Sequence, residues 1–266
     1  MKYALLGDIH ANLPALEAVL ADIDRRDDIH AVFHLGDLVG YAPWPNETVQ
    51  LLWERRISGV SGNYDSTVAA DHAHCGCRYE DERQAALSHE SYEWTRAHVW
   101  PETKGYLGRL PFRLDLRPTG GHGDGPQLIL VHGSPTRNTM YLDADRPDEF
   151  LATMARKAAA RSGDLIAFGH THIPWRREVE GVHFLNVGAV GKPKDGDPRA
   201  AYARVDFSED PPASQIVRVD YEIDRAVAGI EEGGLPETFG EALRTGGRPL
   251  GRPAGELAPT EERTAD

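Results

Sequence analysis

The sequence predicts an α/β protein, and three features of the chain support this class. Short apolar runs alternate with amphipathic segments near the N-terminus, a pattern typical of parallel strands joined by helices. Polar residues follow these runs directly, and in open α/β sheets ligands bind at the carboxyl ends of the strands. Alternating apolar residues in the last third of the chain indicate antiparallel strands instead.

The N-terminal part is predicted to contain three strands and two helices. Residues 3–6 form an apolar run that Gly7 ends, and its length favours a buried strand over a helix. Asn12 can cap the next segment, which has Pro14 in its first turn and apolar residues at helical spacing. The later predicted elements of this part are a strand at 31–35, a helix at 46–56 and a strand at 57–60.

Residues 66–110 interrupt the alternation, and we predict a helical, cap-like insertion there, with a helix at 80–98. The elements predicted after it are strands at 112–116, 127–131 and 165–168, a helix at 147–161, strands at 176–179, 182–187, 201–207 and 215–221, and a helix at 224–231. After about residue 233, Gly, Pro, Glu and Arg dominate. We therefore expect one domain over 1–232 and a flexible, low-complexity tail over 233–266.

The composition bounds the partners and the compartment. The net charge is −13, which argues against a stable nucleic-acid complex and against a polybasic membrane-binding surface. There are only two cysteines, Cys75 and Cys77, so no disulfide framework is expected. The N-terminal apolar run is too short for a signal peptide, and no stretch reaches the length of a membrane span. We expect a cytoplasmic protein.

Eight polar residues at or near the predicted strand ends carry the chemistry. Imidazole nitrogen, carboxylate oxygen and amide carbonyl oxygen suit a divalent metal ion of borderline hardness. Alternate residues of an extended segment point the same way, so two ligands separated by one residue can reach one site. No thiolate is needed, which favours an open catalytic centre over a closed structural zinc site. The residues are Asp8, His10, Asp37, Asn63, Asp65, His132, His170 and His172.

Five short motifs follow predicted strands, in the order GDIH, GDLVG, GNYD, VHGS and GHTH, between Gly7 and His172. The set resembles the signature of calcineurin-like metallophosphoesterases, and more narrowly that of their small bacterial and archaeal phosphodiesterases. The resemblance implies a four-layer αββα fold, with two stacked mixed sheets flanked by helices. It also implies hydrolysis of phosphodiesters, with activated phosphomonoesters as a side activity, by attack of a metal-bridging hydroxide.

The resemblance also implies two divalent ions and their ligands. The first ion would be bound by Asp8, His10, Asp37 and His172. The second would be bound by Asp37, Asn63, His132 and His170, so that Asp37 bridges the pair. Manganese, iron, zinc, nickel and cobalt all accept these ligands, and we favour manganese or iron. Two divalent ions and two carboxylates leave a net positive site, which suits a small anionic phosphate ester.

The third motif departs from the family pattern, because Tyr64 stands where many members have a histidine thought to protonate the leaving group. A tyrosine, with a pKa of about 10, can donate a proton or a hydrogen bond but is not poised near neutrality. Tyr64 is the candidate leaving-group donor, and Asp65 either orients it or supports the metal ligands. We expect weak turnover of unactivated monoesters.

Several alternatives stay open. A protein serine/threonine phosphatase of the same fold is one, and a catalytically weak metal-binding signalling module is another. A homo-oligomer is also compatible with the resemblance. The cluster of His72, His74, Cys75 and Cys77 fits no usual zinc spacing. His34 is expected to be structural. Arg137, Lys192 and Lys194 could meet substrate phosphates, but we expect them to be solvated surface charges.

Overall fold

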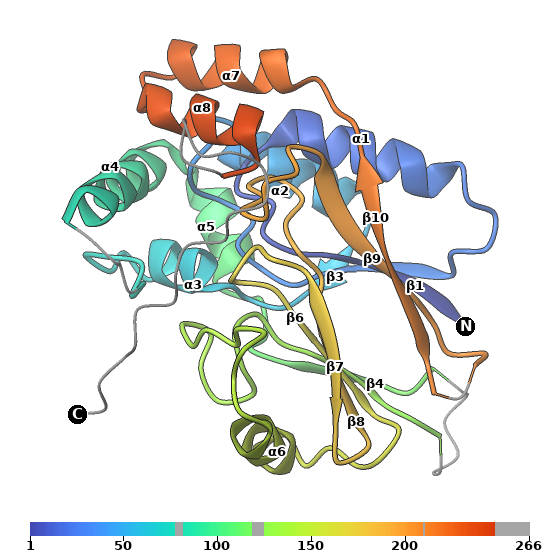
Figure 1. The fold of residues 1–266 in the computed structure, drawn as a ribbon. Coiled ribbons are helices and arrows are strands. Elements are labelled where there is room, and N and C mark those ends of the chain that lie inside the picture. The colour runs from blue at the N-terminus through green and yellow to red at the C-terminus, as the bar shows by residue number, and fades with distance from the viewer. Residues whose placement is uncertain (78–81, 119–124, 210, 248–266) are drawn as a thin grey trace.

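The computed structural model describes residues 1–77, 82–118, 125–209 and 211–247 (Figure 1). Two five-stranded mixed sheets stack face to face, and helices cover both outer faces. Helices α1 (Leu13–Asp24) and α2 (Pro45–Glu54) cover the first sheet, whereas α6 (Asp148–Lys157) covers the second. The predicted αββα architecture is therefore confirmed.

The first sheet has the order β10-β9-β1-β2-β3. Its strands are β1 (Lys2–Leu6), β2 (Ala31–His34), β3 (Ser58–Gly59), β9 (Ala200–Asp206) and β10 (Ala213–Val219). Strands β1, β2 and β3 are parallel, with Tyr3 opposite Ala31, while β9 and β10 are antiparallel. The sequence analysis predicted both the parallel N-terminal strands and the antiparallel pairing of β9 and β10.

The second sheet has the order β4-β5-β6-β8-β7. Its strands are β4 (Leu114–Leu116), β5 (Leu128–Leu130), β6 (Leu165–Phe168), β7 (Trp175–Val179) and β8 (Val182–Asn186). Strands β5, β6 and β8 are parallel, and the edge strands β4 and β7 pair antiparallel with them. The carboxyl ends of the parallel strands carry the motifs of both sheets.

The core follows from the two-residue period of the strands. Leu5 on β1 points between the sheets, where it joins a cluster with Leu130 and Leu185. Its neighbours Ala4 and Leu6 point the other way and pack in the cluster under α1. This alternation buries both faces of β1, so the strand is apolar from Tyr3 to Leu6 and lies at the centre of the first sheet.

Helix α1 begins as the sequence predicts. The side chain of Asn12 accepts a hydrogen bond from the Ala15 amide at 3.2 Å, and Pro14 lies in the first turn. Buried residues then recur at helical spacing from Leu16 to Ile23. The cap fixes the point at which the chain turns from the end of β1 into α1.

The segment between β3 and β4 is helical, but it contains two helices that the sequence analysis missed. They are α3 (Asn63–Ala69) and α5 (Pro101–Leu107), which flank the predicted helix α4 (Glu82–His98). Residues 80 and 81, placed by prediction at the start of this helix, lie outside the described residues. Both missed helices have only seven residues, too few to show a clear apolar period.

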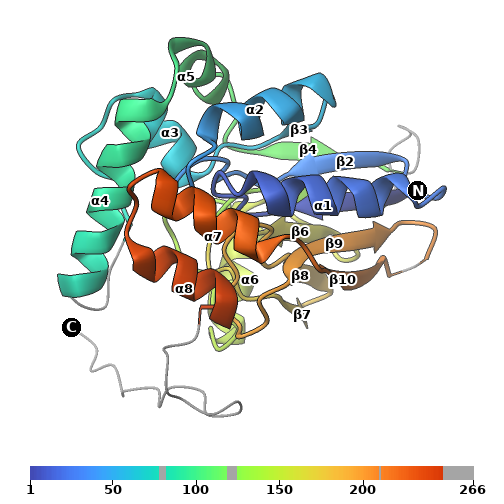
Figure 2. The ribbon, with the colours of Figure 1, turned by 90° about the horizontal axis from the view of Figure 1, so that it is seen from above.

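The prediction of a flexible tail from residue 233 is wrong for the segment that forms α8 (Glu237–Thr245). Leu235, Phe239 and Leu243 recur every four residues and are buried against α7 (Ile223–Glu232). The Trp94 indole nitrogen on α4 donates to the Gly233 carbonyl at 2.8 Å, so the α7–α8 pair also contacts α4 (Figure 2). The rest of the predicted tail, residues 248–266, lies outside the described residues.

No helix in the described part of the chain combines the length and the apolar character that a membrane span requires.

Candidate metal centre

The structure brings all seven predicted metal ligands together at the carboxyl ends of the strands. They follow β1, β2, β5 and β6 or begin α3 just after β3, so both sheets contribute. Each of these residues is at most 4% exposed. The ligands are Asp8, His10, Asp37, Asn63, His132, His170 and His172.

The backbone turns sharply at most of these positions. Five of the ligands have a left-handed backbone with φ between 49° and 66°, namely Asp8, His10, Asp37, His170 and His172. This conformation costs a residue with a side chain about 1–3 kcal/mol and persists where surrounding contacts enforce it. Here the His10 amide donates to the Asp37 carbonyl at 2.9 Å, which ties the first two ligand loops together. Strain is thus concentrated at the centre.

Two glycines allow the loops to approach the carboxylates. A Cβ atom at Gly62 would lie 2.1 Å from Oδ1 of Asp37. A Cβ atom at Gly169 would lie 2.3 Å from Oδ2 of Asp8. Any side chain there would displace a ligand, which explains glycine directly before Asn63 and His170 in the motifs.

The first ligand group consists of Asp8, His10 and His172. His10 Nε2 and His172 Nε2 face each other at 3.2 Å, and His172 Nε2 lies 3.4 Å from Oδ1 of Asp8. The His170 amide donates to Asp8 Oδ2 at 2.9 Å and holds this carboxylate between the two sheets. Three ligand atoms therefore converge on one point.

The second ligand group consists of Asp37, His132 and His170, with Asn63 beside it. His132 Nε2 lies 3.1 Å from His170 Nδ1 and 3.1 Å from Oδ1 of Asn63. The Asn63 amide nitrogen donates away from the group, to the Cys75 carbonyl at 3.1 Å. The amide oxygen is thus left facing the imidazoles.

Asp37 joins the two groups. Its Oδ1 accepts a hydrogen bond from the Tyr64 amide at 2.9 Å. Its Oδ2 lies 3.7 Å from His10 Nε2 and 3.5 Å from His132 Nε2. One carboxylate oxygen therefore stands between the two groups, in the position that a bridging ligand requires.

Backbone carbonyl groups orient three of the four histidines. Nδ1 of His10 lies 3.1 Å from the Val39 carbonyl, and Nδ1 of His132 lies 2.8 Å from the Leu35 carbonyl. Nδ1 of His172 lies 2.6 Å from the carbonyl of Lys192. A carbonyl only accepts, so each Nδ1 carries a proton in these contacts and each Nε2 points into the centre.

The charge balance of the centre calls for cations. Burial lowers the pKa of His10 and of His170 to about 3, so both rings are neutral at pH 7 and can act as ligands. Burial, with the Asp37 charge, raises the pKa of Asp8 to about 7. Burial also disfavours the charged form of His132, but Asp37 outweighs it and raises the pKa of His132 to about 9. Without a metal, the protonated His132 is the main counter-charge to Asp37.

The residues fit two divalent ions. In each group two imidazole nitrogens face each other at about 3 Å. His10 and His172 carry their protons on Nδ1, so neither Nε2 of this pair donates to the other. Two neutral nitrogens at this distance repel unless a cation lies beside both of them. Buried carboxylates likewise need a paired charge or a metal. The donor set is nitrogen and oxygen only, as a catalytic site of this kind requires.

Tyr64 is buried, and its hydroxyl group contacts helix α4. The hydroxyl lies 3.3 Å from Oγ and 3.4 Å from the carbonyl of Ser88. Its ring packs edge-on to His10, with centroids 5.6 Å apart. The role of Tyr64 as leaving-group donor stays a prediction, with no support from this hydroxyl position.

Asp65 supports the ligand loops. Its two oxygens accept from the Leu38 and Gly62 amides, each at 2.9 Å. These amides adjoin Asp37 and Asn63 in sequence, so Asp65 fixes a ligand loop on each side. Burial, with the Asp37 charge, raises the pKa of Asp65 to about 7. The contacts favour the supporting role over the orienting role for Asp65.

The sequence analysis assigned none of three side chains that lie around the ligands to the centre. Tyr41 packs edge-on to His10 with centroids 5.0 Å apart, and Tyr141 lies 4.1 Å from the His170 ring. Lys192, expected to be a solvated surface charge, is partly buried with its ammonium 4.0 Å from the Tyr41 ring. No motif marks these residues, because they reach the site from loops far apart in sequence.

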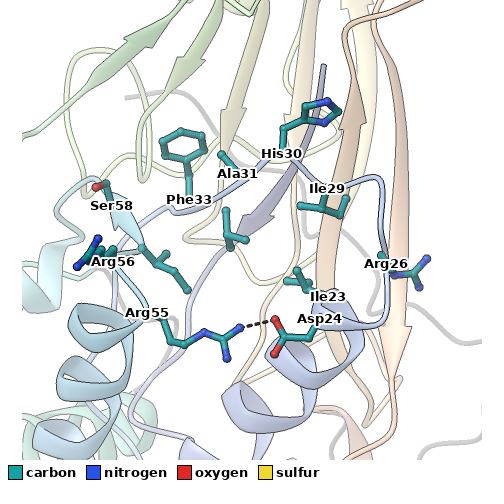
Figure 3. Close-up of a pocket in the computed structure, with 12 residues that line it drawn as sticks. Ile23, Asp24, Arg26, Ile29, His30, Ala31, Phe33, Arg55, Arg56 and Ser58 are labelled. Atoms are coloured by element: carbon teal, nitrogen blue, oxygen red, sulfur yellow. Dashed lines mark hydrogen bonds and ion pairs between the residues drawn. The ribbon is translucent and has the colours of Figure 1, made fainter.

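A cavity of about 600 Å³ lies at the other end of the first sheet, beside the beginnings of β2 and β3 (Figure 3). Phe33 and Ile57 contribute apolar surface, and an ion pair between Arg55 and Asp24 crosses it. None of the predicted metal ligands lines this cavity. It is therefore separate from the centre at the carboxyl ends of the strands.

Comparison with known families agrees with this geometry. A family model described as the calcineurin-like phosphoesterase superfamily domain matches residues 1–210. The chain belongs to the calcineurin-like phosphoesterase superfamily. The matched range contains every ligand of the centre, and membership in a metallophosphoesterase family implies divalent metal ions.

Calcineurin-like relatives span most of the chain. The uncharacterised protein MJ0912 of Methanocaldococcus jannaschii is 33% identical over 260 residues, which are 91% of this chain and 97% of the relative. Phosphodiesterase YfcE of Escherichia coli is 24% identical over 216 residues, 77% of this chain and 88% of the relative. A metallophosphoesterase structure from Sphaerobacter thermophilus has a TM-score of 0.70 at 31% identity and covers 92% of this chain and 99% of its own.

Proposed function

We propose that this calcineurin-like phosphoesterase hydrolyses a small phosphodiester at the centre around Asp37. The observation that carries the proposal is the position of Asp37 Oδ2 between the imidazoles of His10 and His132, at 3.7 Å and 3.5 Å. Asp8, His10, Asp37 and His172 would hold one divalent ion, and Asp37, Asn63, His132 and His170 a second. When bound, two such ions activate water and neutralise phosphate charge. Manganese or iron is the proposed metal.

The residues of the chain contribute mainly by holding the ligands in place. Backbone carbonyls fix the histidine rings, the Tyr64 amide holds Oδ1 of Asp37, and the Asp65 carboxylate holds the adjoining loops. Such preorganisation supplies a large share of the rate enhancement in phosphoryl transfer, because little reorganisation is then needed during the reaction.

A diester with a stable leaving group fits the centre better than an unactivated monoester. The third motif supplies no imidazole to protonate a leaving group, and the Tyr64 hydroxyl is directed at Ser88. Leaving groups that depart as weakly basic anions need no such proton. The phosphodiesterase name of the YfcE relative supports the same choice of substrate.

The test is metal add-back to protein stripped with a chelator. Stepwise addition of manganese should give saturable hydrolysis of an aryl phosphodiester and should raise the melting temperature, because the ions bind only the folded state. Asp37→Asn should abolish both effects. Asp145→Asn makes the same change on an exposed side chain and should preserve both.

The outcomes separate the alternatives. Metal-induced stabilisation without hydrolysis in the presence of manganese, iron, nickel, cobalt or zinc would favour the metal-binding module. Faster turnover of a phosphoserine peptide than of the diester would favour a protein phosphatase.

A further inference from the structure

We infer that Lys192 is a substrate-binding residue whose ammonium group binds a phosphate oxygen of the substrate beside the first ligand group. The inference rests on the proposed function for the identity of the substrate phosphate. It concerns the side chain of Lys192, which no motif assigned to the centre.

The position of Lys192 is tied to both histidines of the first group. Its backbone carbonyl accepts from Nδ1 of His172 at 2.6 Å. Its ammonium lies 4.0 Å from the centre of the Tyr41 ring, and that ring packs against His10 at 5.0 Å. The backbone of Lys192 thus contacts one candidate ligand directly, and its side chain contacts the tyrosine that packs against another, which places the residue at the edge of that site.

The loop that carries Lys192 is rigidly attached to the first ligand loop. The Val190 amide donates to the Gly7 carbonyl at 2.8 Å, and the Gly191 amide donates to the Asp8 carbonyl at 3.0 Å. A Cβ atom at Gly191 would lie 1.7 Å from the Ile9 carbonyl oxygen, so the two loops are in direct contact. The first ligand loop therefore fixes the backbone position of Lys192.

The ammonium group has no anionic partner among the described residues. No carboxylate oxygen of the described chain lies within 4.0 Å of it, and the nitrogen lies over the face of the Tyr41 ring. A cation at a partly buried position is stable only when an anion or an aromatic face compensates for lost hydration. The aromatic face supplies part of this compensation, and an anion at the metal centre would supply the rest.

A phosphate ester is the anion that this position fits. The two carboxylates of the centre are directed at the ligand groups, where Asp37 Oδ2 lies near His10 and His132. A lysine ammonium acts as a point charge for phosphate oxygens and does not demand the planar geometry of arginine. Phosphate oxygens not held by the metal ions are therefore available to Lys192.

The test uses inorganic phosphate as the probe, with full-length protein loaded with manganese. Lys192→Met removes the ammonium but keeps the carbonyl that holds His172, so manganese affinity should stay within about twofold. Phosphate affinity, measured by calorimetry, should fall by about 10- to 100-fold, as for loss of a charge-assisted hydrogen bond. KM for the aryl diester should rise with a smaller change in kcat. Lys192→Arg should recover part of the phosphate affinity.

Lys157→Met is the matched control, because it removes a lysine from an exposed position on α6. Phosphate affinity of Lys192→Met within about threefold of this control would overturn the inference, as would a loss of kcat with unchanged phosphate affinity. If Lys192→Met folds poorly, Lys192→Gln is measured in the same way. Phosphate binding that depends on Lys192, without any ester hydrolysis, would overturn the proposed function and leave the inference standing.

Discussion

The side-chain amide nitrogen of Asn63 donates a hydrogen bond to the Cys77 sulfur at 3.1 Å. The same nitrogen donates to the Cys75 carbonyl, so two acceptors hold the amide with its oxygen facing His132. The cysteine segment therefore contacts the second ligand group, and the described residues contain no metal cluster formed by His72, His74, Cys75 and Cys77. This segment supports a ligand of the centre and does not form a site of its own.

Replacing Cys77 should weaken the second metal site selectively. Cys77→Ala removes one weak acceptor from Asn63, so affinity for the second manganese ion should fall by about two- to tenfold. Affinity for the first ion should be unchanged. Cys75→Ser is the control, because it keeps the backbone carbonyl that accepts from Asn63 and an acceptor for the Cys77 amide. Two-site calorimetry measures both affinities, and equal second-site affinity in the two variants would contradict the prediction.

Removing the Tyr64 hydroxyl should leave catalysis nearly intact. Tyr64→Phe loses the contacts of the hydroxyl with Ser88 and Tyr41, none of which involves a candidate metal ligand, so kcat for an aryl diester should stay within about threefold and stability should fall by about 1 kcal/mol. A hundredfold loss of kcat would instead place the hydroxyl in the reaction. Tyr64→His restores the residue common in the family and should raise monoester turnover. High monoester turnover in the native protein that falls in this variant would refute the proposed preference.

His34 should make the metal-free protein less stable in acid. Burial lowers the pKa of His34 to about 3, and neither ring nitrogen has a hydrogen-bond partner among the residues that the structure describes. Below pH 6.5 the unfolded chain takes up a proton that the folded protein does not. His34 therefore costs no stability above pH 6.5, and the free energy of unfolding decreases as the pH falls from 6.5 toward 3. The expected slope is up to about 1.4 kcal/mol per pH unit.

Urea unfolding of His34→Gln between pH 4.5 and 6.5, in the presence of chelator, measures this contribution. The variant should show a shallower decline than the native protein. Because the ligand histidines titrate in both proteins, the difference between the two curves isolates His34. Parallel curves would show that the ring is protonated in the folded state as readily as in the unfolded chain.

The C-terminal helix should stabilise the wall of the centre. Phe239 on α8 is 7% exposed and packs edge-on to Tyr41 with centroids 5.3 Å apart. Phe239→Ala should lower the free energy of unfolding by about 3 kcal/mol, the lower end for a buried phenylalanine. Phe112→Ala, at a residue that is 41% exposed, should cost far less. If denaturant unfolding showed the same loss of unfolding free energy for both variants, α8 would contribute nothing to the folded core.

The sequence by itself predicted the layered α/β fold and the seven candidate metal ligands. Both predictions depend on short motifs, since each candidate ligand lies in a segment that follows an apolar run and carries a glycine, which at His132 comes after the ligand. Cap and turn residues such as Asn12 act in the same local way, so the beginning of α1 was predictable as well.

Only the tertiary structure decided which groups surround those ligands. The direction of the Tyr64 hydroxyl depends on Ser88 in another helix, and the place of Lys192 depends on the pairing of two distant loops. Helix α8 has an apolar stripe too short to stand out, and it is stabilised by burial against α7. Such contacts join residues far apart in sequence, and their energies come from packing and charge that no local pattern records.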